Sequence, residues 1–299
     1  MLSICIPVYN TDCSTLLDLL AKQIAQLEET VEVLICDDFS TNYTQENKAS
    51  CQNNGFIFLR NKKNLGRIET RKKLISKTIH KWTLFLDADV IPKRDDFAKQ
   101  YVEFIKAGKN PLAIGGCSYP DEIKPFNLRL RYGRNREEMS AEKRQLKPYN
   151  SVLFGNILMK KRLFEEVFEA FNYSEYGEDV HLSSYLKSSK IDVLHLPNEV
   201  YHLGIENNRE FLKKIKKSGQ MHARLDSNST LDLSHIKLVK TGSFLKKYML
   251  HNLVKFALAI TSPFLKTVLI TFGGPLLFVD LMRLYYFLKQ NKWTYSFQS

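Results

Sequence analysis

The alternation of hydrophobic and polar segments in the first ninety residues predicts buried strands joined by helices. Four apolar runs have the length of buried strands and lie at residues 2–8, 31–36, 56–59 and 82–86. The segment after the first run carries Leu and Ile at helical spacing over residues 16–27, and Ser14 is its candidate N-cap. Strands and helices in such short order form βαβ units, so we expect an α/β fold with a mostly parallel sheet and flanking helices.

The pattern becomes less regular after residue 90. Further helices are predicted over residues 95–107, 163–168, 177–187 and 209–225, and further strands over 112–117, 152–159, 191–196 and 199–202. Residues 119–150 form a long, polar, arginine-rich connection, and a connection of that length inside a compact domain is usually functional. Residues 244–292 are strongly apolar, and Gly273, Gly274 and Pro275 should break any helix there.

Two carboxylates follow the apolar run at residues 82–86, in the DXD triplet Asp87, Ala88 and Asp89. The carboxyl ends of buried parallel strands border the crevice of an open sheet, where functional residues gather. Two such carboxylates repel each other unless a cation lies between them. A divalent ion, bound by one or two carboxylates and by substrate phosphates, would supply that charge. The alternative is an ordinary surface turn, since Asp is common after strands.

Polar residues also follow the other strands of the predicted sheet. Asp38 comes directly after the run at residues 31–36, where a carboxylate can accept a hydrogen bond from a nucleotide base or ribose; a helix N-cap is the alternative. Asn64 and Gly66 form a tight turn, and Arg67 and Arg71 follow it at the start of a helix. Backbone N–H groups and Arg at a helix start suit phosphate, although a solvated helix face remains open.

A second acidic pair, Glu178 and Asp179, lies at another predicted helix start. Asp179 could take a proton from an acceptor hydroxyl, and capping is the alternative. His202 follows a short strand and could be a third metal ligand beside carboxylates. His195 competes for that role, His181 is a weaker candidate, and a structural role is open for each.

The basic charge of the chain is concentrated near its C-terminus. The net charge is +12 and the isoelectric point about 9.3. Residues 203–299 contain fifteen Lys and Arg against five Asp and Glu, so this region could meet nucleic acid or an anionic membrane. The lysines of residues 213–217 lack the interleaved aromatic residues that nucleic-acid binding favours. We therefore expect a membrane surface as the partner, and no nucleic acid.

The apolar pieces at residues 256–265 and 267–279 are each shorter than the roughly 18 residues of a clean membrane-spanning helix. Flanking lysines and aromatic residues favour a segment that lies in, or re-enters, the cytoplasmic leaflet. A helical pair packed on the enzyme or on a second copy, and a hairpin across the bilayer, are the alternatives. Five Cys without a paired framework and an N-terminus that opens on a strand predict a cytoplasmic protein without a secretory signal, peripheral on the inner face of the membrane.

Six motifs occur in the order found in glycosyltransferase family 2, so the chain resembles that family over roughly residues 1–205. The motifs are IPVYN at 6–10, DDFST at 37–41, NLG at 64–66 with Arg71, LDAD at 86–89, FGN at 154–156 and GED at 177–179. The resemblance implies a GT-A (Rossmann-like) fold. It also implies an inverting, metal-dependent sugar transfer from a nucleotide-diphosphate donor, commonly UDP-linked, to a hydroxyl of a glycan or lipid-linked acceptor in surface polysaccharide synthesis.

The resemblance also implies roles for individual residues, with Asp38 at the uracil, Asp179 as the base, and Mn²⁺ or Mg²⁺ as the cofactor. The nucleotide-sugar residues would be Pro7, Tyr9, Asn10, Asp38, Asn64, Gly66, Arg71, Asp87 and Ala88. The metal ligands would be Asp87, Asp89 and His202, and the acceptor side would include Gly155, Asn156 and Glu178. The chain departs from the family at Phe39, where Gly is usual, and residues 119–150 follow no family pattern.

The resulting division is a GT-A domain of residues 1–205, with a nucleotide-binding half at 1–90 and an acceptor half at 91–205. A basic helical linker at 206–243 and an apolar, membrane-associated helical region at 244–299 would follow.

Two other functions compete with the glycosyltransferase. A nucleotidyltransferase is expected to have a Gly-rich loop with Lys or Arg near the first strand. This chain has Tyr9, Asn10, Thr11 and Asp12 at that place. A non-enzymatic basic membrane- or nucleic-acid-binding module would leave the acidic residues without a role.

Overall fold

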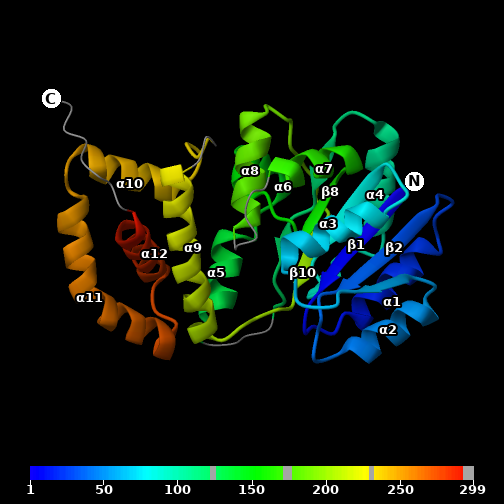
Figure 1. The fold of residues 1–299 in the computed structure, drawn as a ribbon, viewed down its shortest axis with the longest axis horizontal. Helices are drawn as coiled ribbons and strands as arrows, with labels where there is room; N and C mark the ends of the chain where they lie inside the picture. Colours follow the sequence, from blue (N-terminus) through cyan, green and yellow to red (C-terminus); the bar gives the residue numbers. More distant parts are fainter. Residues whose placement is uncertain (122–125, 171–176, 229–231, 292–299) are drawn as a thin grey trace. The chain divides into compact units, whose positions relative to one another are not determined.

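The computed structural model describes residues 1–121, 126–170, 177–228 and 232–291. The chain forms two compact units (Figure 1). Unit 1 comprises residues 1–120 and 136–204, and unit 2 comprises residues 121–135 and 205–299. The sequence did not predict that residues 121–135 join the C-terminal unit. The finer division at residues 205 and 243 stays a prediction.

Unit 1 is built on a seven-stranded sheet with the order β3-β2-β1-β4-β8-β6-β9. Its strands are β1 (Leu2–Val8), β2 (Val31–Asp37), β3 (Ile57–Arg60), β4 (Trp82–Leu86), β6 (Leu112–Ile114), β8 (Asn156–Lys160) and β9 (Leu194–His195). The first four strands are parallel, and β8 runs antiparallel to both β4 and β6. The predicted α/β fold with a mostly parallel sheet is confirmed, and the carboxyl ends of β1, β2 and β4 lie at one edge.

Helices cover both faces of this sheet. They are α1 (Ser14–Ile24), α2 (Thr44–Asn53), α3 (Arg67–Lys77), α4 (Phe97–Ala107), α6 (Ala141–Gln145), α7 (Lys161–Ala170) and α8 (Glu178–Ser188), with a 3₁₀ turn at Pro148–Ser151. Leu2, Ile4, Ile6 and Val8 of β1 pack in one core with α1 and α4, whereas Cys5 faces the core of α3, α7 and α8. Burial on both faces explains the continuous apolar runs of these strands.

The predicted cap of the first helix is corrected by the structure. Ser14 is the first helical residue, and Cys13 is the N-cap without a side-chain hydrogen bond. The Asp12 carboxylate instead accepts hydrogen bonds from the Ser14 backbone N–H at 2.9 Å and from its hydroxyl at 2.6 Å. The capping function therefore lies two residues earlier than predicted.

A three-stranded second sheet consists of β5 (Val90–Pro92), β10 (Val200–His202) and β7 (Cys117–Ser118). The single strand predicted over residues 112–117 is two strands, β6 and β7, which belong to different sheets. The chain turns between them at Gly116, which has φ +82°, and a Cβ there would lie 2.4 Å from the Arg144 guanidinium carbon. β10 runs antiparallel to β5 with His202 opposite Val90, so this sheet carries His202 to the end of the DXD triplet.

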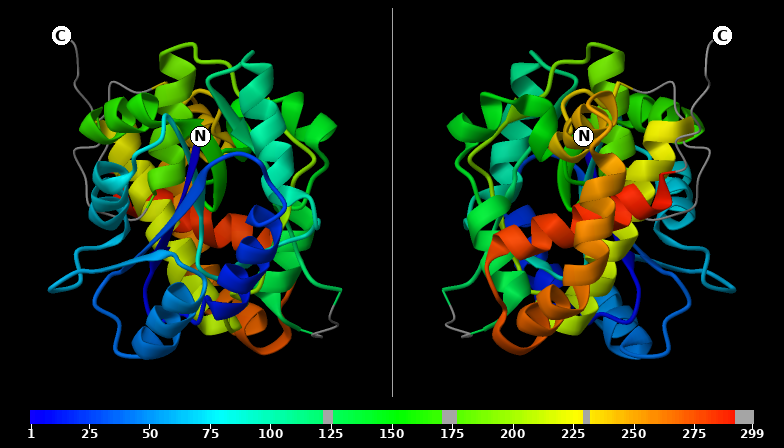
Figure 2. Two further views of the ribbon diagram at one scale, coloured as in Figure 1. Left: turned by 90° about the vertical axis from the view of Figure 1, so that its right-hand side faces the viewer. Right: turned by 90° about the vertical axis from the view of Figure 1, so that its left-hand side faces the viewer.

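Unit 2 is helical. It contains α5 (Leu128–Arg136), except for its last residue, together with α9 (Asn208–Asn228), α10 (Lys237–Lys247), α11 (His251–Phe272) and α12 (Leu276–Gln290). Its core is formed by Leu128, Phe211, Leu212, Ile215, Leu265, Leu269, Val279 and Met282. The right panel of Figure 2 shows α11, in orange, in front of α12, in red. The predicted break is confirmed, since α11 ends before Gly273, which has φ +67°.

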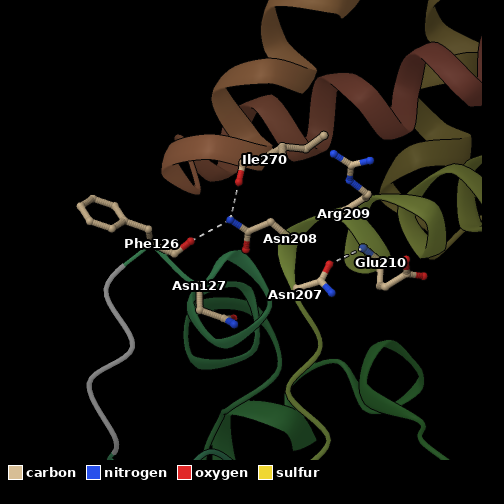
Figure 3. A pocket seen from close by; sticks show the side chains of 7 residues that line it. All are labelled: Phe126, Asn127, Asn207, Asn208, Arg209, Glu210 and Ile270. Carbon is tan, nitrogen blue, oxygen red and sulfur yellow. Dashed lines mark hydrogen bonds between the residues drawn. The ribbon is translucent and has the colours of Figure 1, made fainter.

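An open pocket of about 540 Å³ lies in unit 2 at the start of α9 (Figure 3). Its polar side chains hold helix ends together. Asn208 donates hydrogen bonds to the carbonyls of Phe126 and Ile270 at 2.9 and 3.0 Å, and the side chain of Asn207 caps α9 by accepting from the Glu210 backbone N–H at 3.0 Å. These groups are engaged within the fold, so the pocket is not the candidate active site.

Candidate active site

The loops that follow β1 and β2 are joined through Asn10. Its side-chain oxygen accepts hydrogen bonds from the backbone N–H groups of Thr41 and Asn42 at 2.8 and 3.2 Å, and its own backbone N–H donates to Ser40 Oγ at 2.9 Å. Pro7 lies in β1 opposite Cys36 of β2, at the start of the same crevice. Tyr9, between Pro7 and Asn10 in the chain, is exposed and can present its ring to a ligand.

Asp38 is buried and organises the loop that follows β3. Its carboxylate accepts hydrogen bonds from the Asn61 side chain at 2.7 Å and from the backbone N–H groups of Leu65 and Gly66 at 2.8 Å each. Asn64 lies exposed in the same turn, and its side chain also accepts from the Gly66 backbone N–H, at 3.2 Å. A carboxylate offers about four acceptor positions, so one remains for a ligand. The predicted contact of Asp38 with a base stays a prediction.

Phe39 has φ +65°, in the left-handed region that glycine adopts freely. The chain therefore keeps the backbone shape expected of Gly at this position, at a cost of roughly 1–2 kcal/mol for a residue with a side chain. The ring is exposed, with the Arg60 guanidinium over it at 5.6 Å from the ring centre. The departure from the family pattern thus places an exposed aromatic ring directly after Asp38, in a backbone conformation that suits glycine.

Arg71 is the buried link between the acidic residues. Its guanidinium binds Glu178 Oε1 at 2.6 Å and Asp87 Oδ1 at 3.0 Å, and it lies 4.6 Å from the centre of the Phe154 ring. Both Arg71 and Glu178 are buried, and the exposed Arg67 also reaches Glu178, at 3.3 Å. The predictions that Arg71 contacts the nucleotide and Glu178 the acceptor stay predictions. In this arrangement they hold Asp87, and Arg67 has the better access to a phosphate.

The segment Phe154–Gly155 positions two of the carboxylates. The Phe154 backbone N–H donates to Asp179 Oδ1 at 2.8 Å, and the Asp87 backbone N–H donates to the Gly155 carbonyl at 3.3 Å. A Cβ on Gly155 would lie 2.6 Å from Asp87 Oδ2, so only glycine leaves room for that carboxylate. Burial, and then the charge of Glu178, raise the pKa of Asp179 to about 7, which suits a general base.

The amide of Asn156 is buried within unit 1. Its side-chain NH₂ donates to the carbonyls of Gly116 and Asn198 at 2.9 Å each, and its oxygen accepts from the Tyr101 hydroxyl at 2.6 Å. Both amide hydrogens are thus used within unit 1. These bonds tie β8 to the loops that carry Gly116 and Asn198, and the acceptor role predicted for Asn156 stays a prediction.

Asp89 and His202 face each other across the second sheet. Asp89 Oδ2 lies 3.8 Å from His202 Nε2, and the Leu203 backbone N–H donates to the Asp89 carbonyl at 2.8 Å. The imidazole stacks on Tyr119 with ring centres 5.8 Å apart. A carboxylate oxygen and an imidazole nitrogen are ligands that suit Mn²⁺. The described residues contain no group of three His, Cys, Asp or Glu side chains placed to hold a metal, so water or substrate oxygens would complete the coordination of such an ion.

His195 and His181 do not join this pair. His195 is buried, its ring nitrogens lie 2.9 Å from the Pro148 carbonyl and 3.2 Å from Arg144, and burial lowers its pKa to about 4. His181 lies in α8, where burial lowers its pKa. Ala88 is nearly buried and contributes backbone at the crevice. Among the three histidines considered, His202 alone lies beside Asp89.

Sequence reasoning missed Gly204 and Tyr119. A Cβ on Gly204 would lie 1.9 Å from Asp89 Oδ2 and 3.1 Å from His202 Cε1, so this glycine leaves the space that both side chains occupy. Tyr119 is buried beneath His202 and donates its hydroxyl to Glu137. A glycine two residues after a candidate ligand was the only signal in the sequence.

We expect Gly204→Ala to weaken Mn²⁺ binding about 10- to 100-fold, the range seen when residues supporting metal ligands are changed. The physical reason is that the new methyl group displaces the Asp89 carboxylate. Calorimetric titration with Mn²⁺ in the presence of UDP measures the effect. Gly55→Ala is the control for a general loss of stability, because its φ of +68° strains an alanine while a Cβ there meets nothing within 4 Å. Unchanged Mn²⁺ affinity in Gly204→Ala would show that Asp89 does not bind the ion.

Several solved structures share this fold. Staphylococcus aureus TarS aligns with a TM-score of 0.52 and 20% identity over 82% of this chain, and the chain covers only 42% of that TarS chain. The TarS 1–349 fragment in complex with UDP-GlcNAc gives a TM-score of 0.52 and 15% identity, with 97% of this chain and 90% of that one covered. The mannosyltransferase PcManGT from Pyrobaculum calidifontis, in complex with GDP-Man and Mn²⁺, gives 0.55 and 12%, covering 96% and 85%.

Glucosyl-3-phosphoglycerate synthase from Mycobacterium tuberculosis, in complex with Mn²⁺, UDP and glucosyl-3-phosphoglycerate, aligns with a TM-score of 0.51 and 14% identity, covering 75% of this chain and 79% of that one. At these identities the likeness shows the GT-A fold alone. No curated protein matches the chain by sequence. The sequence model of Glycosyl transferase family 2 matches residues 3–168, more than half of the chain. The chain therefore belongs to glycosyltransferase family 2.

Proposed function

We propose that this glycosyltransferase moves a sugar from a nucleotide-diphosphate donor, a UDP-sugar, to an acceptor hydroxyl with inversion at the anomeric carbon. The observation that carries the proposal is the joint placement of Asp87 and Asp179 by Phe154, Gly155 and Arg71. This arrangement sets a base with a raised pKa beside the strand end that carries the DXD triplet. The structures of TarS and of the mycobacterial synthase with UDP support a uridine donor.

The nucleotide would lie at the carboxyl ends of β1, β2 and β4. Asp38 would accept a hydrogen bond from the base, and the exposed ring of Tyr9 would cover it. Backbone N–H groups at the start of α3, together with Arg67, would attract the diphosphate. Pro7, Asn10, Asn64, Gly66, Asp87 and Ala88 would shape the walls of this site.

The residues present fit a divalent cation. Asp89 Oδ2 and His202 Nε2 are close enough to share one ion, and Nδ1 of His202 has no hydrogen-bond partner among the described residues. Asp87 would lie at the same ion or the donor ribose. A bound Mn²⁺ or Mg²⁺ supplies charge stabilisation to the leaving diphosphate.

Asp179 would act on the acceptor. Its carboxylate takes the proton of the acceptor hydroxyl, and the acceptor oxygen forms a bond to the anomeric carbon. The bond from that carbon to the diphosphate oxygen breaks, and the nucleoside diphosphate leaves with the bonding electron pair. Attack from the face opposite the leaving group inverts the anomeric configuration. Arg71 and Glu178 position Asp87 in this scheme and touch no reacting atom.

A screen of nucleotide sugars with Mn²⁺ and without acceptor tests the proposal. We expect slow release of nucleoside diphosphate from one donor, its loss in EDTA and its return with excess Mn²⁺. The Asp89→Ala variant should lose the activity at every Mn²⁺ concentration, whereas Asp121→Ala, an acidic residue outside unit 1, should keep it. Donor turnover that persists in EDTA would overturn the metal dependence, and no turnover of any donor would count against the donor class.

We also propose that the acceptor is a glycan or lipid-linked sugar in surface polysaccharide synthesis, and that the enzyme works at the cytoplasmic face of a membrane. The basic excess of residues 203–299 supports this location. Family membership removes the support for a non-enzymatic module and for a nucleotidyltransferase. A homo-oligomer remains a prediction that light scattering of the purified chain can test.

A further inference from the structure

Helix α11 of unit 2 is apolar on nearly all sides but is packed along only one narrow stripe. Its buried residues are His251, Leu258, Leu265 and Leu269. It is the helix among the described residues that is long and apolar enough to cross a membrane by length and composition, and only 17% of its apolar window is buried. A helix that is apolar all round and not covered by its own protein is expected to meet another apolar phase.

The face opposite the buried stripe carries large apolar side chains in a continuous row. Leu253, Phe256, Ile260 and Phe264 are each 65% exposed and are spaced three or four residues apart, so they line one side of the helix. The row continues into the turn between α10 and α11, where Met249 is 69% exposed. We call these five residues the α11 face. Contiguous exposed apolar surface of this kind marks an interaction site.

The charge around this face selects its partner. Residues 233–279 contain six lysines and no Asp or Glu. Lys255 and Lys266 lie on α11 eleven residues apart, which places both on the same flank of the helix, about 70° from the buried stripe. A row of large apolar residues with lysines on its flank and no acidic residue complements an anionic lipid surface, into which lysine stems extend while their charges remain at the headgroups.

The same lysines argue against a spanning helix. They leave ten charge-free residues, 256–265, which cover about 15 Å along the axis. The hydrocarbon core of a bilayer is about 30 Å thick. Pro263 also interrupts the backbone hydrogen bonds of α11 near its middle.

We propose that the α11 face is a membrane-docking surface: α11 lies in the plane of an anionic leaflet, with Phe256, Ile260 and Phe264 inserted among the acyl chains. This inference rests on the membrane location in the proposed function and names the surface that makes the contact. A second copy of the chain is the competing occupant. An apolar contact between copies would not need the flanking lysines, and neither Lys255 nor Lys266 forms an ion pair with an acidic residue in the part of unit 2 that the structure describes.

Co-sedimentation of the full chain with vesicles, without any donor, tests the proposal. We expect binding to vesicles of equal parts phosphatidylglycerol and phosphatidylcholine, and weak binding to phosphatidylcholine alone. Phe256→Gln/Phe264→Gln should weaken binding about 30-fold or more, since two large apolar side chains no longer leave water. The matched control is Ile79→Gln/Leu146→Gln in unit 1, which changes two residues that are 77% and 81% exposed and should leave binding unchanged.

A second double variant tests the electrostatic contribution of the two lysines to vesicle binding. Lys255→Gln/Lys266→Gln should weaken binding to the anionic vesicles about 25-fold, or fivefold for each lysine, whereas Lys77→Gln/Lys109→Gln in unit 1 should not. In a Trp82→Phe/Trp293→Phe background, which removes the two native tryptophans, Ile260→Trp reports the depth of the helix centre. Lipids brominated on the acyl chain near the headgroup should quench the fluorescence of this tryptophan more than lipids brominated near the end of the acyl chain. The reverse order would show that α11 spans the bilayer.

Two results would overturn the proposal. One is the absence of sedimentation with anionic vesicles. The other is a dimer in light scattering that Phe256→Gln/Phe264→Gln dissociates, with no vesicle binding, which would assign the face to a second copy. Failure here is distinguishable from failure of the proposed reaction, because vesicle binding is measured without donor and donor turnover without vesicles.

Discussion

Asp179→Asn lowers the rate of sugar transfer to the acceptor by a factor of about 10²–10⁴, while the affinity for the nucleotide donor stays unchanged. This is the expected result because the amide cannot take the acceptor proton, a step worth that factor in general base catalysis. The Asn oxygen can still accept the hydrogen bond from the Phe154 backbone N–H, so the local fold is kept. Steady-state kinetics with the donor found in the screen, and titration with that donor, measure the two quantities.

The pH dependence provides a control for this variant. Burial and the charge of Glu178 raise the pKa of Asp179 to about 7, so the active carboxylate forms as the pH rises through that value. We expect kcat/KM of the native enzyme to rise with pH and to level off above about 7. The residual activity of Asp179→Asn should lack this rise.

The stability of the same variant separates catalysis from folding. A carboxyl group whose pKa is raised by folding favours the folded state below its unfolded pKa, and this contribution is lost as the pH rises through the folded value. Asp179→Asn should therefore be at least as stable as the native protein at pH 8. An inactive variant that is also much less stable at pH 8 would point to a structural role instead. Full transfer activity in Asp179→Asn would remove Asp179 as the base.

Arg71→Met should destabilise the protein by about 3–5 kcal/mol, because it removes the buried cation between Asp87 and Glu178 and leaves the Glu178 carboxylate only the exposed Arg67. Urea unfolding followed by circular dichroism measures the loss. We expect donor turnover at low temperature, where the variant remains folded, to fall as well, since Asp87 loses its anchor.

A double variant tests the cause of this loss. Arg71→Met/Glu178→Gln removes the buried charge together with its partner, so it should recover part of the stability. Lys72→Met is the control on the same helix, where an exposed pair with Glu69 contributes little. A loss below 1 kcal/mol in Arg71→Met would show that the guanidinium does not hold the two carboxylates.

Much of unit 1 follows from local sequence. The continuous apolar run of β1 predicts a strand covered on both faces, and residues 2–8 form one. The glycine pair at residues 273 and 274 predicts a helix end, and α11 ends there because Gly273 adopts φ +67°. Such features depend on backbone preferences and on burial, which neighbouring residues decide.

Other parts of the site depend on contacts between distant segments. Nothing near Arg71 in the sequence indicates that its guanidinium is buried between Asp87, 16 residues away in the chain, and Glu178, 107 residues away. The polar, arginine-rich appearance of residues 119–150 predicted a connection, yet part of this segment packs in unit 2 through Leu128. Asn156 has the residue type of an acceptor contact, and only its neighbours show that its amide is used within the fold.

The sequence by itself determined the family, the α/β class and the succession of the first strands along the chain, because short motifs and local hydrophobic patterns carry this information. It also singled out the acidic residues that we propose for the site. The tertiary structure decided how those residues meet. The antiparallel pairing of β10 with β5 brings His202 to Asp89, and the close approach at Gly155 and Gly204 leaves room for two carboxylates. Both outcomes depend on strand pairing and on steric space between segments far apart in the chain, which no local pattern encodes.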